Sequence, residues 1–177
     1  MRIPGEQLSR GRVEYLSGKS EGADERMDPR RLYLDTSVYN RPFDDLSQAR
    51  VWLEALALAV ILQMLESGSV ELVSSEVLEF ENSRNPFPYR KARVSFYLSL
   101  CKDYQQLDES IRKRARVLEG QSLEPLDALH LACAEEAKAG YFITCDDRII
   151  KRYQGEALTV MNPVNYVISE VIGDGGD

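Results

Sequence analysis

Acidic side chains stand at four places along this 177-residue chain where they could bind a cation. They are Asp35, a group of glutamates between positions 76 and 81, Asp127 and Asp146. The first follows the apolar run 32–34, and the last follows a similar run at 141–144. In an open α/β sheet, ligands bind at the carboxyl edge of the strands, where such residues lie. Carboxylates gathered there repel one another unless a cation is present, so the pattern predicts a Mg²⁺ or Mn²⁺ site.

Each of these acids also has a structural interpretation, because carboxylates are common where helices begin. Asp35 could cap a helix or belong to a turn, and Asp127 falls in the first turn of an expected apolar helix. Asp146 is followed by Asp147, which is an equally good cap. Hydroxyl side chains beside the acids favour a functional site, since they can donate hydrogen bonds to a carboxylate or a phosphate. These supporting residues are Thr36, Ser37 and Thr144.

The sequence does not assign the second acid uniquely. Glu76, Glu79 and Glu81 belong to one short expected helix, on which at most one or two can face the same point. Glu76 falls in the first turn, where a carboxylate is also favourable to the helix dipole. All three therefore remain candidates.

His130 is the only histidine and lies one helical turn after Asp127. A lone histidine in an apolar helix is expected to be a hydrogen-bonded core or supporting residue rather than a metal ligand. Without a partner nucleophile it is also weak evidence for acyl transfer.

Strand and helix patterns alternate along the chain, which favours a mostly parallel sheet covered by helices on both faces. The expected strands are 32–34, 70–73, 104–107, 141–144 and 158–161. The expected helices are 47–67, 75–83, 88–101, 108–119, 126–139 and 146–152. Residues 1–30 predict a flexible extension in which Met27 could be an alternative start, residues 31–168 one domain, and residues 169–177 a disordered acidic tail.

The formal charge of −7 argues against a protein that binds nucleic acid by bulk charge. Local basic clusters remain at 84–93 and 112–116, although either could be a solvated helix face. Three cysteines without a CxxC pair make a disulfide framework or zinc site unexpected and fit a reducing cytoplasm. We find no secretory signal or membrane-spanning segment in the sequence, so we expect a cytoplasmic location.

The expected helix 47–67 is apolar on nearly every side. One face should pack on the sheet, and the second needs another helix, a partner subunit or a bound protein. The sequence leaves open whether this second face is buried within the chain or forms a protein interface.

Taken in order, these acidic motifs resemble those of the PIN-domain family of metal-dependent nucleases. Residues 34–37 (LDTS), 75–81 (SEVLEFE), 126–132 (LDALHLA) and 144–146 (TCD) are similar to the four acidic motifs of that family. The resemblance covers about residues 31–164 and implies a three-layer α/β/α sandwich, an acidic centre for Mg²⁺ or Mn²⁺, and hydrolysis of RNA phosphodiesters. It implies Asp35, Glu81, Asp127 and Asp146 as the catalytic and metal-binding residues, with Glu81 the best match by its spacing from Ser75.

The family also implies partners, since many PIN proteins are toxins of toxin–antitoxin pairs and form homodimers. The polar segment 39–45 departs from the usual apolar continuation, so Asn40 and Arg41 could contact substrate phosphate. Arg84 and other cations in the inserted segment 82–93 could guide single-stranded RNA. The alternatives are a catalytically weak RNA- or protein-binding module and a haloacid-dehalogenase-like phosphatase. That phosphatase class needs an Asp two positions after the first, where this chain has Ser37.

Overall fold

The structure is a computed structural model that describes residues 30–173. The expected N-terminal extension, including Met27, and the end of the tail at 174–177 lie outside the described residues.

A five-stranded sheet, with all strands parallel, forms the centre of the domain in the order β3-β2-β1-β4-β5. The strands are β1 (Arg30–Leu34), β2 (Val70–Ser75), β3 (Asp103–Gln105), β4 (Tyr141–Ile143) and β5 (Thr159–Met161). The central strand pairs Leu32 with Leu72 on one side and with Tyr141 on the other. Because every strand runs in the same direction, all five carboxyl ends meet at one edge of the sheet.

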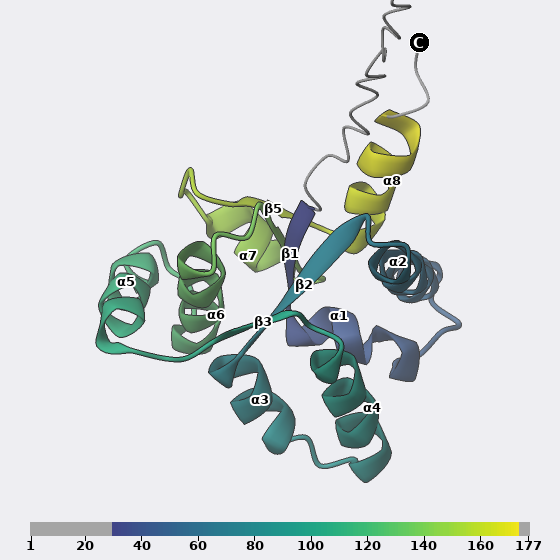
Figure 1. The fold of residues 1–177 in the computed structure, drawn as a ribbon, viewed down its shortest axis with the longest axis horizontal. Helices are drawn as coiled ribbons and strands as arrows, with labels where there is room; N and C mark the ends of the chain where they lie inside the picture. Colours follow the sequence, from purple (N-terminus) through teal and green to yellow (C-terminus); the bar gives the residue numbers. More distant parts are fainter. Residues whose placement is uncertain (1–29, 174–177) are drawn as a thin grey trace, which may run out of the picture.

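Helices cover both faces of this sheet. They are α1 (Thr36–Asn40), α2 (Ala49–Glu66), α3 (Glu76–Ser83), α4 (Pro88–Ser99), α5 (Glu109–Glu119), α6 (Pro125–Glu136), α7 (Asp147–Arg152) and α8 (Pro163–Gly173), with a 3₁₀ turn η1 (Arg41–Phe43). Figure 1 shows α5, α6 and α7 on one side of the sheet and α1, α2, α4 and α8 on the other. The expected three-layer α/β/α sandwich with a mostly parallel sheet is therefore confirmed.

The core lies where the helices cover β1. Leu32, Tyr33 and Leu34 are fully buried, because a central parallel strand has helices on both faces. α2 ends at Glu66, and Gly68 follows its C-cap as the sequence predicts, since the φ of +78° at this residue is readily adopted only by glycine.

Some boundaries differ from the sequence prediction. α1 and α8 were not expected, and β1 begins at Arg30, one residue before the expected start of the domain. α8 runs to Gly173, so residues 169–173, which the sequence assigned to a tail, are helical. β3 begins one residue before the expected strand, and α6 ends at Glu136 instead of 139.

The apolar helix α2 is only partly covered within the chain. Leu58 and Ile61 are buried, and α2 packs against β2 and α8. Trp52, Leu53 and Leu56 remain exposed on it. Complete burial within the chain is therefore wrong for this helix, while a partner on the exposed side stays a prediction.

Two further findings concern the cysteines and the apolar character of the helices. All three cysteines lie in the described part of the chain and are free thiols, two of them buried. No helix within residues 30–173 has the length and apolar character needed to cross a membrane.

Candidate metal centre

Asp35 lies where β1 ends, and its carboxylate is held by one hydroxyl group from α1 and one from the residue that follows β4. Oδ2 accepts hydrogen bonds from Ser37 Oγ at 2.5 Å and from Thr144 Oγ1 at 2.8 Å. The backbone of Asp35 occupies the N-cap position of α1, yet its side chain makes no capping hydrogen bond. The carboxylate therefore does not cap the helix and is turned toward the carboxyl end of β4.

Glu81 is the glutamate of α3 that reaches Asp35. Its Oε2 accepts a hydrogen bond from Thr36 Oγ1 and lies 2.8 Å from His130 Nε2. One ligand atom from each of Asp35, Glu81 and His130 lies within 4.8 Å of the others. Burial raises the pKa of Glu81, but hydrogen bonds from His130 and Thr36 outweigh it and hold the pKa below its usual value.

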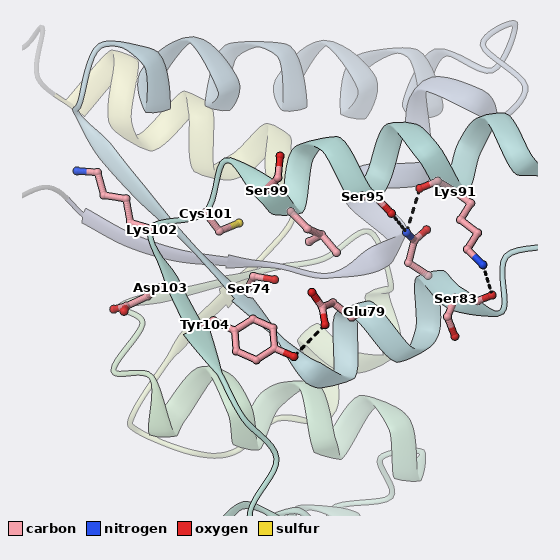
Figure 2. A pocket seen from close by; sticks show the side chains of 12 residues that line it. Ser74, Glu79, Ser83, Lys91, Ser95, Ser99, Cys101, Lys102, Asp103 and Tyr104 are labelled. Atoms are coloured by element: carbon pink, nitrogen blue, oxygen red, sulfur yellow. Dashed lines mark hydrogen bonds between the residues drawn. The ribbon is translucent and has the colours of Figure 1, made fainter.

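The other two glutamates of α3 point elsewhere. Glu79 Oε2 accepts a hydrogen bond from Tyr104 Oη at 2.9 Å, and both residues line a separate cavity of about 390 Å³ between α3 and α4 (Figure 2). Glu76 Oε2 accepts a hydrogen bond from the backbone N–H of Leu107 at 3.0 Å. The geometry therefore favours Glu81, and not Glu76 or Glu79, as the acid that shares a centre with Asp35.

His130 is buried in α6 and has a partner at each ring nitrogen. Nδ1 lies 2.8 Å from Tyr33 Oη, and Nε2 is engaged by Glu81. Tyr33 Oη also lies 2.6 Å from Ser75 Oγ, which accepts the N–H of Leu78 and so caps α3. With both nitrogens engaged by side chains, His130 can hold the Glu81 carboxylate in one orientation, and its supporting role stays a prediction.

Tyr33 is the member of this network that the sequence reasoning missed. Burial, followed by Cys133 and then by the charges of Asp35 and Glu81, raises the pKa of Tyr33 well above its usual value, so its hydroxyl keeps its proton. The available signal was an aromatic residue with a polar tip inside a fully buried strand, two positions before Asp35.

Asp127 stands in the first turn of α6, half-buried beside the other acids. Burial, followed by the charges of Asp35 and Asp146, raises its pKa to about 6. Within residues 30–173 its carboxylate has no hydrogen-bond donor as a partner, which separates it from the other acids of the site. An ionised Asp127 is thus unfavourable here unless a positive charge approaches it.

Asp146 follows β4 and caps α7. Its Oδ1 accepts the N–H of Arg148 at 2.8 Å, and its carboxylate pairs with the Arg148 guanidinium at 2.6 Å. The hydrogen bonds from Arg148 lower the pKa of Asp146. Asp147 is not the cap; it pairs with Arg50 of α2 instead. Asp146 therefore lies near Asp127 as an ionised carboxylate, at the exposed side of the cluster.

The candidate substrate residues are placed differently from one another. Arg41 is committed to ion pairs with Glu54 and Asp44, so its guanidinium is not presented to the acids. Asn40 donates to the backbone of Thr36 and accepts from Asn85, while the exposed Arg84 lines a groove together with Glu81. Of the three, Arg84 is the side chain available to a ligand at this edge.

Comparisons with known proteins bear on the class of this fold and site. A family model described as PIN domain matches residues 32–156. The chain belongs to the PIN domain family, as its four acidic motifs predict, and the haloacid-dehalogenase alternative is set aside. No curated protein sequence matches the chain. Among solved structures it is similar to VapBC2 from Rickettsia felis bound to a DNA fragment from the promoter, with 12% identity, a TM-score of 0.49, and coverage of 75% of this chain and 98% of that chain.

Proposed function

We propose that this protein is a metal-dependent ribonuclease that hydrolyses RNA phosphodiester bonds. The observation that supports it most is the meeting of Asp35 and Glu81 at the carboxyl edge of the sheet, with Asp127 close enough for the charge of Asp35 to raise its pKa, in a chain of the PIN domain family. These residues come from β1, α3 and α6, so no single element could account for their proximity.

The donor set fits a hard divalent cation. Asp35, Glu81 and Asp127 would hold Mg²⁺ or Mn²⁺, with Asp146 reaching it directly or through water, since these cations prefer carboxylate oxygens. The raised pKa of Asp127 is the electrostatic sign of this fit, because carboxylates that repel each other are stabilised by a cation between them. When bound, the cation would neutralise charge at the phosphate and lower the pKa of the water that attacks phosphorus.

The chain's own side chains would position the acids. Ser37 and Thr144 fix the Asp35 carboxylate, and Thr36 and His130 fix that of Glu81. Asp35 and Glu81 thus each have a single orientation before any ligand arrives, which reduces the reorganisation needed during the reaction. The scheme requires no nucleophile from the protein.

The biological setting is a further part of the proposal. We infer a toxin that acts in the cytoplasm, is restrained by an antitoxin protein and forms a homodimer. The exposed apolar side of α2, formed by Trp52, Leu53 and Leu56, supports a protein partner, because a contiguous apolar surface is costly in water.

A cleavage assay tests this function. Purified protein with Mn²⁺ should cleave single-stranded RNA, and EDTA or the variant Asp127→Asn should abolish cleavage. Asp103→Asn is the matched control, since Asp103 lies on β3, is exposed and pairs only with Arg31 in the described part of the chain. Intact RNA in the presence of metal, or full activity of Asp127→Asn, would show that the proposal is wrong.

A further inference from the structure

A groove of about 440 Å³ opens beside the acid cluster and shares a wall with it. Thr36 and Glu81 of the acid cluster line it, together with Phe87 of the segment that joins α3 to α4 and Arg90 of α4. A chain molecule held at the acids would therefore extend directly into this groove.

Phe87 presents an aromatic ring on a stiff backbone. The side chain is 55% exposed, and it stands between Pro86 and Pro88, which restrict the backbone on both sides. Its N–H donates to Asn85 Oδ1 at 3.1 Å, which closes the turn. An exposed aromatic ring that is already ordered can bind a flat ligand at small entropic cost.

A cation holds this ring in place. The Arg90 guanidinium lies 4.8 Å from the centroid of the Phe87 ring and 5.7 Å from that of Phe43. Arg90 is itself fixed, because it donates to the carbonyl oxygen of Phe43 and pairs with Asp44. The stack Phe43–Arg90–Phe87 ties the groove wall to η1, and so builds the ring into the fold beside the acids.

The polar side chains of the groove divide into two kinds. Asn40 and Asn85 form hydrogen bonds to each other and to the backbone of Thr36 and Phe87. Their amides are therefore used to hold the backbone of the groove wall. Arg84 is exposed and lines the groove, and no carboxylate within residues 30–173 pairs with it. The groove thus offers a ring face and a positive charge rather than a set of free amides for reading base edges.

We propose that this groove holds one unpaired nucleotide next to the scissile phosphate, an inference that rests on the ribonuclease function proposed above. The base stacks on Phe87, and Arg84 neutralises the phosphate on the far side of that nucleotide. Stacking depends on the π face that every base has, so the groove accepts all four bases with similar affinity.

The test measures binding of single-stranded RNA to protein that the substitution Asp127→Asn makes inert. An oligonucleotide is prepared in versions that each lack one base. The dissociation constant of each version is measured for the protein that keeps Phe87 and for the Phe87→Ala variant. At one position beside the cleavage site, base removal should weaken binding about tenfold with Phe87 and hardly at all with Phe87→Ala. Exchange of that base among the four kinds should have a much smaller effect.

Matched variants separate stacking from damage to the fold. Phe87→Tyr should retain binding and Phe87→Leu should lose it, because only the first keeps an aromatic face. Phe96→Ala is the control: Phe96 is similarly exposed, has Arg93 over its ring, and does not line the groove. Thermal unfolding of each variant shows that the domain is intact.

The outcomes distinguish this inference from the function on which it rests. If the active protein cleaves RNA but base removal costs the same with Phe87 and with Phe87→Ala at every position, the nucleotide site is wrong and the nuclease stands. The opposite outcome is that the active protein cleaves no RNA, while base removal still weakens RNA binding much more with Phe87 than with Phe87→Ala. In that case the nucleotide site is supported and the proposed ribonuclease function is wrong.

Discussion

The Nε2 atom of His130 lies 2.8 Å from Oε2 of Glu81, while the other ring nitrogen of the histidine is held by the buried hydroxyl of Tyr33. This contact links α6 to α3 across the carboxyl edge of the sheet. It gives the glutamate one orientation, and it connects the acid cluster to Ser75, the residue that caps α3.

Removing the histidine should therefore weaken metal binding and stability together. His130→Ala removes one hydrogen-bond partner from Glu81 and one from the buried hydroxyl of Tyr33, and we expect a loss of about 1–3 kcal/mol in the free energy of unfolding. The affinity for Mn²⁺ should fall about 10- to 100-fold, as when other residues that orient metal ligands are removed. Calorimetric titration with Mn²⁺ and urea unfolding measure the two effects. A variant that binds Mn²⁺ as tightly as the parent would contradict the orienting role.

The three glutamates of α3 can be separated by a set of matched substitutions. Glu81→Gln should abolish RNA cleavage, because it removes the only one of the three charges that lies beside Asp35. Glu76→Gln and Glu79→Gln should keep most of the activity, since these side chains bond to Leu107 and Tyr104. Initial rates of RNA cleavage with Mn²⁺ measure this. Full activity of Glu81→Gln would show that the acid is assigned wrongly.

Asp127 should make the metal-free protein less stable above pH 6. Its pKa is raised from 3.8 to about 6, so the protonated form stabilises the fold; that contribution is complete below pH 3.8 and is lost as the pH rises through 6. At pH 7.5 in EDTA, the free energy of unfolding of Asp127→Asn should be about 2 kcal/mol higher than that of the parent. The difference should shrink at pH 4. Urea titrations at the two pH values test this.

Addition of Mg²⁺ should reverse that order at pH 7.5. The cation stabilises the parent by binding only the folded state, and Asp127→Asn should gain little. Equal stabilisation of both proteins by Mg²⁺ would mean that Asp127 does not hold the cation.

Glu54 should be important for stability rather than for RNA binding. Its side chain is fully buried in α2 and accepts from Arg41 at 2.5 Å, Arg50 at 2.9 Å and Asn162 at 2.6 Å. Burial raises the pKa of Glu54, but these hydrogen bonds and the charge of Arg41 outweigh it and lower the pKa. Glu54→Ala leaves Arg41 without its buried partner and should cost about 3 kcal/mol.

Arg41→Ala should in turn lower stability and leave RNA affinity almost unchanged, whereas Arg84→Ala should weaken RNA binding without a change in stability. Urea unfolding and filter binding of single-stranded RNA measure these effects. A large loss of RNA affinity in Arg41→Ala would instead support the hypothesis, drawn from the sequence, that Arg41 contacts substrate phosphate.

Much of the fold follows from local patterns. The short apolar runs before Asp35 and Asp146 predict strands, and Gly68 and Pro125 predict helix boundaries that the structure contains. α1 and α8 were missed because α1 has only five residues and α8, which begins at Pro163, runs into the segment near the end of the chain where the composition suggested a tail. Both helices pack on α2, and stability that comes from such packing is not reported by a local pattern.

The sequence by itself determined the family, the parallel sheet and the four places from which acids come, because each depends on residue type and spacing along the chain. The tertiary structure decided which side chains share a centre. It favours Glu81 over Glu76 and Glu79. It also pairs Arg41 with Glu54, and it links Tyr33 to His130, which contacts Glu81. These choices depend on how α3 and α6 are rotated against the sheet, and that rotation is set by packing between residues far apart in sequence.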